Sequence, residues 1–188
     1  MDISTTLQES KSFSEVIHLT DNIKWSSAAN HYCLKQYRLE SGYLGASQSG
    51  VEYLSVLVTN GVLEVSNAGF RMQLRCEEGC HILPRSRFML RSTTERATFL
   101  VASAREHSIE SVDSAHESEE MDFMPLSAYT VFKPWGWERW YTQNAPHRER
   151  FALKLIYMNK GHQSSLQSHV HKSETNMVIH GRAKVLSG

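Results

Sequence analysis

The chain has 188 residues, of which 40% are hydrophobic and 21% charged, as in ordinary globular proteins. Twenty basic and twenty acidic side chains cancel, so no net field favours nucleic acid or an anionic membrane. No apolar run reaches the roughly 18 residues of a membrane span, and the N-terminus lacks the basic and apolar pattern of a signal peptide. Three cysteines are too few for a disulfide framework. We therefore expect a cytoplasmic protein that binds neither nucleic acid nor membrane.

Residues 1–31 are polar and weakly patterned, and from Tyr32 onward short β segments alternate with turn residues. Asn60-Gly61 and Asn67-Ala68-Gly69 are typical of hairpin turns. Many short strands at this spacing predict a closed or sandwiched all-β unit over residues 32–104. The expected strands are 53–59, 62–65, 70–75, 81–83, 88–91 and 97–102.

The composition changes over residues 105–127, which contain seven acidic side chains, many serines and few large apolar residues. Such a stretch predicts a solvated linker. β patterning resumes at Tyr129, so residues 128–188 are expected to form a second unit.

An internal repeat supports this division. Residues 34–42 parallel residues 153–161, and residues 60–65 parallel residues 180–185, at offsets of 119 and 120 residues. Two copies of one fold are therefore predicted. Gly188 falls opposite Ala68, so the second copy is expected to be incomplete at its C-terminal side.

A histidine-rich segment in the second copy contains candidate metal ligands. Gln167 and His169 stand two residues apart, and Glu174 follows. Side chains at i and i+2 on a strand point to one face, where a carboxylate from the next strand can meet them. An imidazole, an amide oxygen and a carboxylate suit zinc, manganese or iron.

The spacing from Gly161 to Gly181 resembles the first motif of the cupin superfamily, with Gln167 at the usual first histidine. The resemblance implies a tandem pair of jelly-roll β-barrels and a metal held by Gln167, His169 and Glu174, with His171 beside the site. Two alternatives stay open. The histidine pair could be His169 and His171, or the segment could be a polar turn without metal.

The flanks resemble a narrower family, the type II mannose-6-phosphate isomerase domain, which is also the C-terminal part of bifunctional mannose-1-phosphate guanylyltransferases. The resemblance covers residues 129–188 and rests on four stretches, 132–138, 153–156, 166–174 and 181–185. It implies a metal-dependent interconversion of mannose 6-phosphate and fructose 6-phosphate, within GDP-mannose biosynthesis. Lys133 and Thr175-Asn176 depart from the family pattern.

The resemblance makes a sugar phosphate the expected ligand. His171 or Lys154 would touch the substrate, and a carboxylate or a histidine would move the proton. Lys154 could equally be an outward, solvated lysine. The second cupin motif is missing before Gly188, so we expect little isomerase activity from this chain. We also expect a homodimer, because unpaired strand edges promote association. The competing hypothesis is a non-catalytic bicupin that binds a sugar or another small ligand.

The first copy is expected to bind no metal, because Ser47, Ser49 and Leu54 stand at the ligand positions. Cys76 and Cys80 with His81 could form a zinc half-site, but a second pair of ligands is missing from the sequence nearby. Three tryptophans of the second unit could stack on a sugar ring or cover a barrel end, namely Trp135, Trp137 and Trp140.

Overall fold

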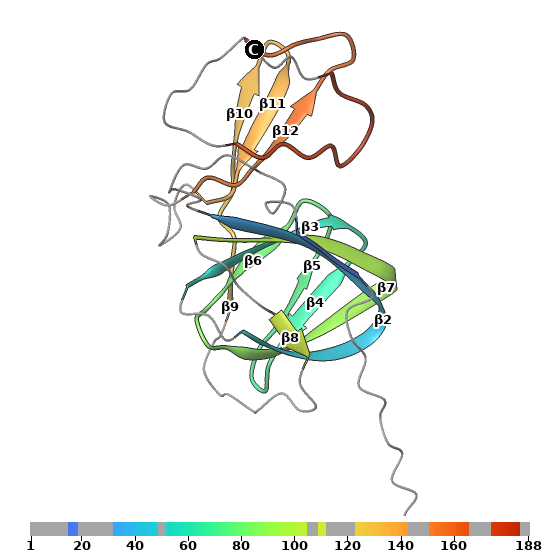
Figure 1. Cartoon of the computed structure of the whole chain (residues 1–188), viewed down its shortest axis with the longest axis vertical. Helices are drawn as coiled ribbons and strands as arrows, with labels where there is room; N and C mark the ends of the chain where they lie inside the picture. The colour runs from blue at the N-terminus through green and yellow to red at the C-terminus, as the bar shows by residue number, and fades with distance from the viewer. Residues whose placement is uncertain are drawn as a thin grey trace, which may run out of the picture.

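A computed structural model describes residues 15–18, 32–48, 52–104, 109–111, 123–142, 151–165 and 174–184. Within these ranges the chain forms twelve strands and no helix, which confirms the all-β prediction. The described part accordingly contains no helix long and apolar enough to cross a membrane. The strands divide into a curled nine-stranded sheet and a separate three-stranded sheet (Figure 1).

The nine-stranded sheet is antiparallel throughout, and β2 and β7 are its longest strands. The main path runs β1-β2-β7-β3-β6-β9, while β4 pairs with β5 and β7, and β8 pairs with β2. The strands are β1 Glu15–His18, β2 Cys33–Gln48, β3 Leu54–Asn60, β4 Leu63–Ser66, β5 Arg71–Leu74, β6 Gly79–Ile82, β7 Arg87–Ser103, β8 Ile109–Ser111 and β9 Phe123–Pro125.

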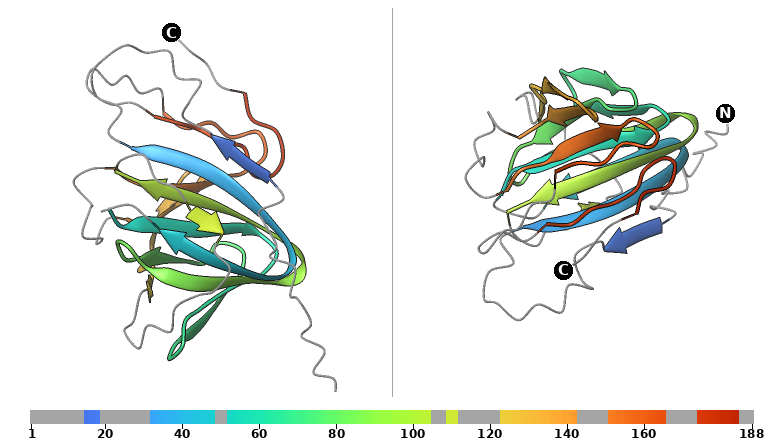
Figure 2. Two further views of the ribbon diagram at one scale, coloured as in Figure 1. Left: turned by 60° about the horizontal axis from the view of Figure 1, so that its bottom comes forward. Right: turned by 90° about the horizontal axis from the view of Figure 1, so that it is seen from above.

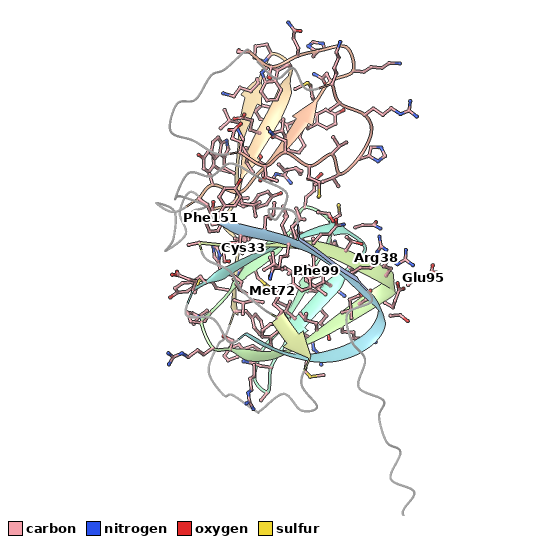
Figure 3. The ribbon with its side chains drawn as sticks, viewed as in Figure 1. Cys33, Arg38, Met72, Glu95, Phe99 and Phe151 are labelled. Carbon is pink, nitrogen blue, oxygen red and sulfur yellow. The ribbon has the colours of Figure 1, made fainter. Side chains whose placement is uncertain are left out.

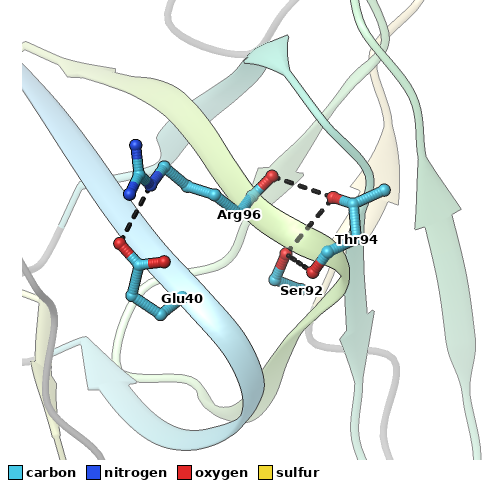
Figure 4. Close-up of polar contacts among 4 residues, drawn as sticks. All are labelled: Glu40, Ser92, Thr94 and Arg96. Carbon is cyan, nitrogen blue, oxygen red and sulfur yellow. Dashed lines mark hydrogen bonds and ion pairs between the residues drawn. The ribbon is translucent and has the colours of Figure 1, made fainter.

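Strand β7 replaces two expected strands, 88–91 and 97–102, with one bent strand. The pairing with β2 skips at the bend, where both Ser41 and Gly42 lie opposite Ser92. Side-chain oxygens satisfy the backbone there, because the Ser92 hydroxyl donates to the Thr94 carbonyl at 3.0 Å (Figure 4). The Thr94 hydroxyl donates to the Arg96 carbonyl at 2.8 Å. Polar residues that look like a loop in the sequence thus form a β-bulge.

Alternate side chains of the curled sheet point inward and form an apolar core. Phe99 of β7 is fully buried and stacks on Tyr37 of β2, with ring centroids 5.6 Å apart (Figure 3). Burial raises the pKa of Tyr37 to about 12. This core is the result of the period-two alternation that the sequence predicts for half-buried strands.

The sheet is wider than residues 32–104. Strand β1 comes from the polar N-terminal segment and pairs with β2. Strands β8 and β9 lie within the expected linker 105–127 and pair with β2 and β6. Ile109 and Phe123 are buried there. Two short segments of the acidic stretch therefore join the sheet. Each places one apolar side chain in the core and forms backbone hydrogen bonds with the neighbouring strand.

The three-stranded sheet has the order β10-β11-β12, with β10 Tyr129–Lys133, β11 Gly136–Trp140 and β12 Lys154–Met158. Pro134 and Trp135 form the turn between β10 and β11. Gly136 has φ +151°, and a Cβ there would lie 2.0 Å from the carbonyl oxygen of Tyr157. The Trp135 carbonyl also accepts a hydrogen bond from the Asn159 amide at 2.8 Å. The Pro-Trp-Gly motif therefore has a structural role, holding three strands together.

The two sheets pack against each other through a second apolar cluster. Leu34, Leu57 and Leu100 contribute from the outer face of the large sheet. Leu155 contributes from β12, the buried Tyr141 and Leu153 contribute from positions beside β11 and β12, and Phe151 lies at the junction (Figure 3). The views in Figure 2 show the small sheet against the curled sheet. The part of one face of the small sheet around Leu155 is thus covered by the large sheet.

Candidate functional site

Lys154, the predicted substrate-binding lysine, lies at the start of β12 in a cluster of charged and aromatic groups. Its ammonium is 3.2 Å from a carboxylate oxygen of Glu138 on β11. The same ammonium lies over the ring of Trp140, 4.8 Å from the centroid, as in a cation–π contact. The Lys154 and Glu138 side chains are only 26% and 12% exposed. Lys154 is therefore an oriented and partly buried cation, which disfavours the alternative of an outward, solvated lysine.

Strand register places these groups on one face, here called the Lys154 face. Lys154 pairs with Trp140, which pairs with Tyr129, and Ile156 pairs with Glu138. Side chains two residues apart on a strand share a face. The Lys154 face therefore consists of Tyr129, Val131, Lys133, Gly136, Glu138, Trp140, Lys154, Ile156 and Met158. Tyr129 and Trp140 stack on it with centroids 6.5 Å apart.

The opposite face of the small sheet is fixed to the large sheet by Glu77, in the turn between β5 and β6. Arg139 donates to the Glu77 carboxylate at 2.8 Å, and the Tyr141 hydroxyl donates to the Glu77 carbonyl at 2.9 Å. Burial raises the pKa of Tyr141 to about 12. Glu77 has φ +68°, an uncommon value for a residue with a Cβ. These contacts leave the Lys154 face directed away from the large sheet.

The predicted metal ligands are only partly visible. Gln167, His169 and His171 lie outside the described residues. Glu174 is described and exposed. Within the described ranges, no group of three histidine, cysteine, aspartate or glutamate side chains could hold a metal ion. The metal set Gln167, His169 and Glu174 therefore stays a prediction, as does the choice between its two registers.

In the large sheet, an apolar side chain occupies the position that corresponds to the metal-binding glutamate of cupins. Leu54, at the position of the cupin glutamate, is fully buried in the core. Ser49 lies outside the described residues. The absence of metal from this copy stays a prediction, although apolar side chains of this kind offer no ligand.

Cys76 and Cys80, the two cysteines of the zinc half-site named in the sequence analysis, lie in different environments. Cys80 points into the core and Cys76 is exposed. Burial raises the pKa of the Cys80 thiol to about 12, and burial together with the Glu77 charge raises the pKa of Cys76. A thiol must lose its proton to bind zinc. This environment therefore disfavours a zinc site at Cys76 and Cys80.

Sequence reasoning missed Glu138 as a site residue and left the role of Trp140 open. Both belong to an alternating segment, and their relation to Lys154 depends on the pairing of β11 with β12. Residues 138 and 154 are separated by a long connection whose register cannot be counted from the sequence. The only available signal was the alternation of Glu138 and Trp140, which places them on one face of a strand.

Residues 120–188 match the family model described as Mannose-6-phosphate isomerase C-terminal. This match confirms the predicted resemblance to the cupin-type isomerase domain, and it includes Glu138, Trp140 and Lys154. No curated protein matches the sequence.

Solved structures with similar folds include cupins at low identity. A cupin 2 domain-containing protein from Halorhodospira halophila has 17% identity and a TM-score of 0.42, with 52% of this chain and 68% of that chain covered. A cupin-2 domain containing protein from Shewanella frigidimarina NCIMB 400 has 12% identity and a TM-score of 0.39, over 50% and 84% of the two chains. An HTH_3 family transcriptional regulator from Vibrio cholerae has 15% identity and a TM-score of 0.36, over 40% and 44%. This chain spans less than half the length of the Vibrio cholerae regulator.

Proposed function

We propose that residues 128–188 belong to a metal-dependent sugar-phosphate isomerase site of the mannose-6-phosphate type, in a tandem cupin whose second barrel is incomplete within these residues. The observation that carries the proposal is the Lys154–Glu138–Trp140 cluster, inside the segment that matches the isomerase family model. A cation beside a carboxylate and an indole ring can meet a phosphate, a hydroxyl group and the apolar face of a sugar.

The reaction moves one proton between C1 and C2 of the opened sugar, and the chain's own residues supply the groups for it. Lys154 would bind the phosphate or donate to a sugar oxygen, and Glu138 would hold its ammonium in position. His171 is the proposed proton carrier. Gln167, His169 and Glu174 would hold the divalent ion, which polarises the carbonyl and hydroxyl oxygens when bound. Amide, imidazole and carboxylate donors suit zinc best, with manganese or iron also acceptable.

A second candidate is a non-catalytic tandem cupin that binds a sugar or another small ligand. It is favoured by the apolar interior of the large sheet, where the ligand position of the cupin glutamate is occupied by Leu54. In that case the same Lys154 face binds the ligand without turnover.

Binding measurements on the whole 188-residue chain test the proposal before any turnover assay. We expect calorimetry to show zinc binding that is lost in His169→Ala and kept in His162→Ala, a control at an exposed histidine outside the ligand set. With the metal present, mannose 6-phosphate should bind, and Lys154→Met should weaken that binding at least tenfold. Metal binding that is unchanged in both His169→Ala and Glu174→Gln contradicts the proposed site.

Turnover then separates the two candidates. Fructose 6-phosphate formation that disappears in His171→Ala supports the isomerase. Binding of mannose 6-phosphate without turnover supports the non-catalytic protein for this chain, and it also fits the low activity expected from the sequence.

A further inference from the structure

Three aromatic side chains form a row across the small sheet, on the face opposite Lys154. Phe132 of β10 pairs with Trp137 of β11, and Trp137 pairs with Tyr157 of β12. Residues directly opposite each other in antiparallel strands point to the same side of the sheet, so these three side chains share one face of the neighbouring strands β10, β11 and β12 (Figure 1). We call them the aromatic row. The proposed sugar-phosphate site does not use them.

The aromatic row is exposed to solvent and is not part of either apolar cluster. Phe132 is 81% exposed and Tyr157 is 51% exposed. Trp137 is half-buried, because its ring stacks on Tyr157 with centroids 5.4 Å apart and planes 12° from parallel. Large apolar side chains that gather on a surface mark a binding site more often than side chains that are exposed singly.

The internal repeat shows that the aromatic row lies on the outer surface of its unit. Tyr157 follows Arg38 by 119 residues, which is the repeat offset. Trp137 lies opposite Tyr157, just as Glu15 lies opposite Arg38. The neighbouring Tyr37 points into the core of the large sheet, so Arg38 points away from that core. Two aromatic residues of the small sheet therefore occupy outward positions that two charged residues occupy in the large sheet.

The aromatic row is bordered by polar groups whose charges cancel. Arg139 is the one charged residue on this face of β10, β11 and β12, and its guanidinium lies 5.1 Å from the centroid of the Trp137 ring. The same guanidinium is 2.8 Å from the carboxylate of Glu77. Its Nε donates to the Thr130 hydroxyl at 3.3 Å. Hydrogen-bonding groups thus lie next to the rings, while the surface carries no net charge.

These features select the kind of ligand. A proline-rich peptide needs a groove between aromatic rings, and the rings of Trp137 and Tyr157 stack on each other without room for a proline ring between them. An anionic ligand or membrane needs a cation that is not already paired, whereas Arg139 is paired with Glu77. The remaining fit is a neutral molecule with flat apolar faces and many hydroxyl groups.

From this geometry we infer that the aromatic row binds a neutral, unphosphorylated saccharide chain. Sugar rings would stack their C–H faces on Phe132 and Tyr157, and sugar hydroxyls would bond to Arg139 and Glu77. The row spans two strand spacings, roughly 10 Å, or about two linked sugar rings. This site lies on the face opposite Lys154 and needs neither metal nor phosphate, so it is independent of the proposed isomerase function.

Titration of the whole 188-residue chain with cellohexaose and with mannohexaose, two neutral oligosaccharides, tests the inference by calorimetry. We expect saturable binding of at least one of them. Phe132→Ala and Tyr157→Ala should each weaken it about fivefold, because each removes one aromatic contact with the sugar. Both side chains are exposed, so the variants should keep the fold. Raising the salt concentration should leave the affinity unchanged, because no ion pair forms with the ligand.

Tyr129→Ala is the matched control, because Tyr129 is 41% exposed and stacks on Trp140 of the Lys154 face. This variant should bind the oligosaccharide like the wild type, and Tyr157→Ala should bind mannose 6-phosphate like the wild type. Weakening by Tyr129→Ala equal to that by Tyr157→Ala would place the saccharide elsewhere and overturn the inference. Absence of saturable binding of both oligosaccharides at millimolar concentration also overturns it. A homodimer that excludes them and dissociates in Phe132→Ala would assign the row to a second copy instead.

Discussion

Equivalent strands of the two sheets carry similar side chains in different surroundings. In the large sheet, β2 has neighbours on both edges and its inward side chains Tyr37 and Leu39 are buried. In the small sheet, β12 has one described neighbour, and Ile156 and Met158 are exposed. The comparison shows that alternation of apolar residues makes a strand able to line a core. Burial itself depends on whether a second layer of strands is present.

The largest expected effect comes from replacing one aromatic ring in each sheet. Phe99→Ala removes a fully buried ring that stacks on Tyr37, so we expect a loss of about 3–5 kcal/mol in the free energy of unfolding. Phe132→Ala removes a ring that is 81% exposed and should change stability by less than about 0.5 kcal/mol. Urea denaturation followed by circular dichroism measures both. Equal losses would mean that the small sheet has a core of its own.

The two equivalent glycines give an intermediate effect. A Cβ at Gly61 would lie 2.1 Å from the Arg96 carbonyl oxygen, whereas a Cβ at Gly181 meets nothing within 4 Å. Both substitutions carry the left-handed penalty of about 1–2 kcal/mol. Gly61→Ala adds overpacking, for a total of roughly 3 kcal/mol or more. We expect the difference to appear in the midpoints of urea denaturation, and a Gly181→Ala variant as unstable as Gly61→Ala would indicate close packing around residue 181.

The smallest expected effect concerns the contact between the sheets. Tyr141→Phe removes the hydroxyl that donates to the Glu77 carbonyl and should cost about 1 kcal/mol at neutral pH. Three of the four tryptophans, Trp135, Trp137 and Trp140, belong to the small sheet and its turn, so fluorescence reports mainly that sheet. Far-ultraviolet circular dichroism reports all strands. We expect the fluorescence transition to move to lower urea than the circular dichroism transition in this variant.

The same variant should change the response to alkali. The pKa of Tyr141 is raised from 10.0 to about 12 in the fold. A raised tyrosine pKa contributes stability below pH 10, and that contribution is lost as the pH rises toward 12. Tyr141→Phe should therefore flatten the decline of stability over this range, as measured by urea midpoints at each pH. An unchanged slope would contradict the burial of this hydroxyl in the fold.

The sequence predicted most local features of the fold for physical reasons that act over a few residues. The turn at Asn60-Gly61 was predicted because glycine adopts the required positive φ. The bent β7 was not predicted, because Ser92 and Thr94 satisfy the backbone with their own hydroxyls only when β2 and β4 are beside them. Strands β8 and β9 were not predicted, because their buried apolar residues, Ile109 and Phe123, lie in a stretch of mainly acidic and polar composition.

For the candidate site, the sequence alone determined the motif around Gln167, His169 and Glu174, the lysine at 154 and the resemblance to an isomerase domain. Only the tertiary structure decided that Lys154 lies beside Glu138 and over Trp140, and that the face carrying them is directed away from the large sheet. The two-residue spacing of Gln167 and His169 is the period of a strand, which can be counted in the sequence. Register between distant strands is set by packing and by hydrogen bonds across the sheet, which exist only once the chain has folded.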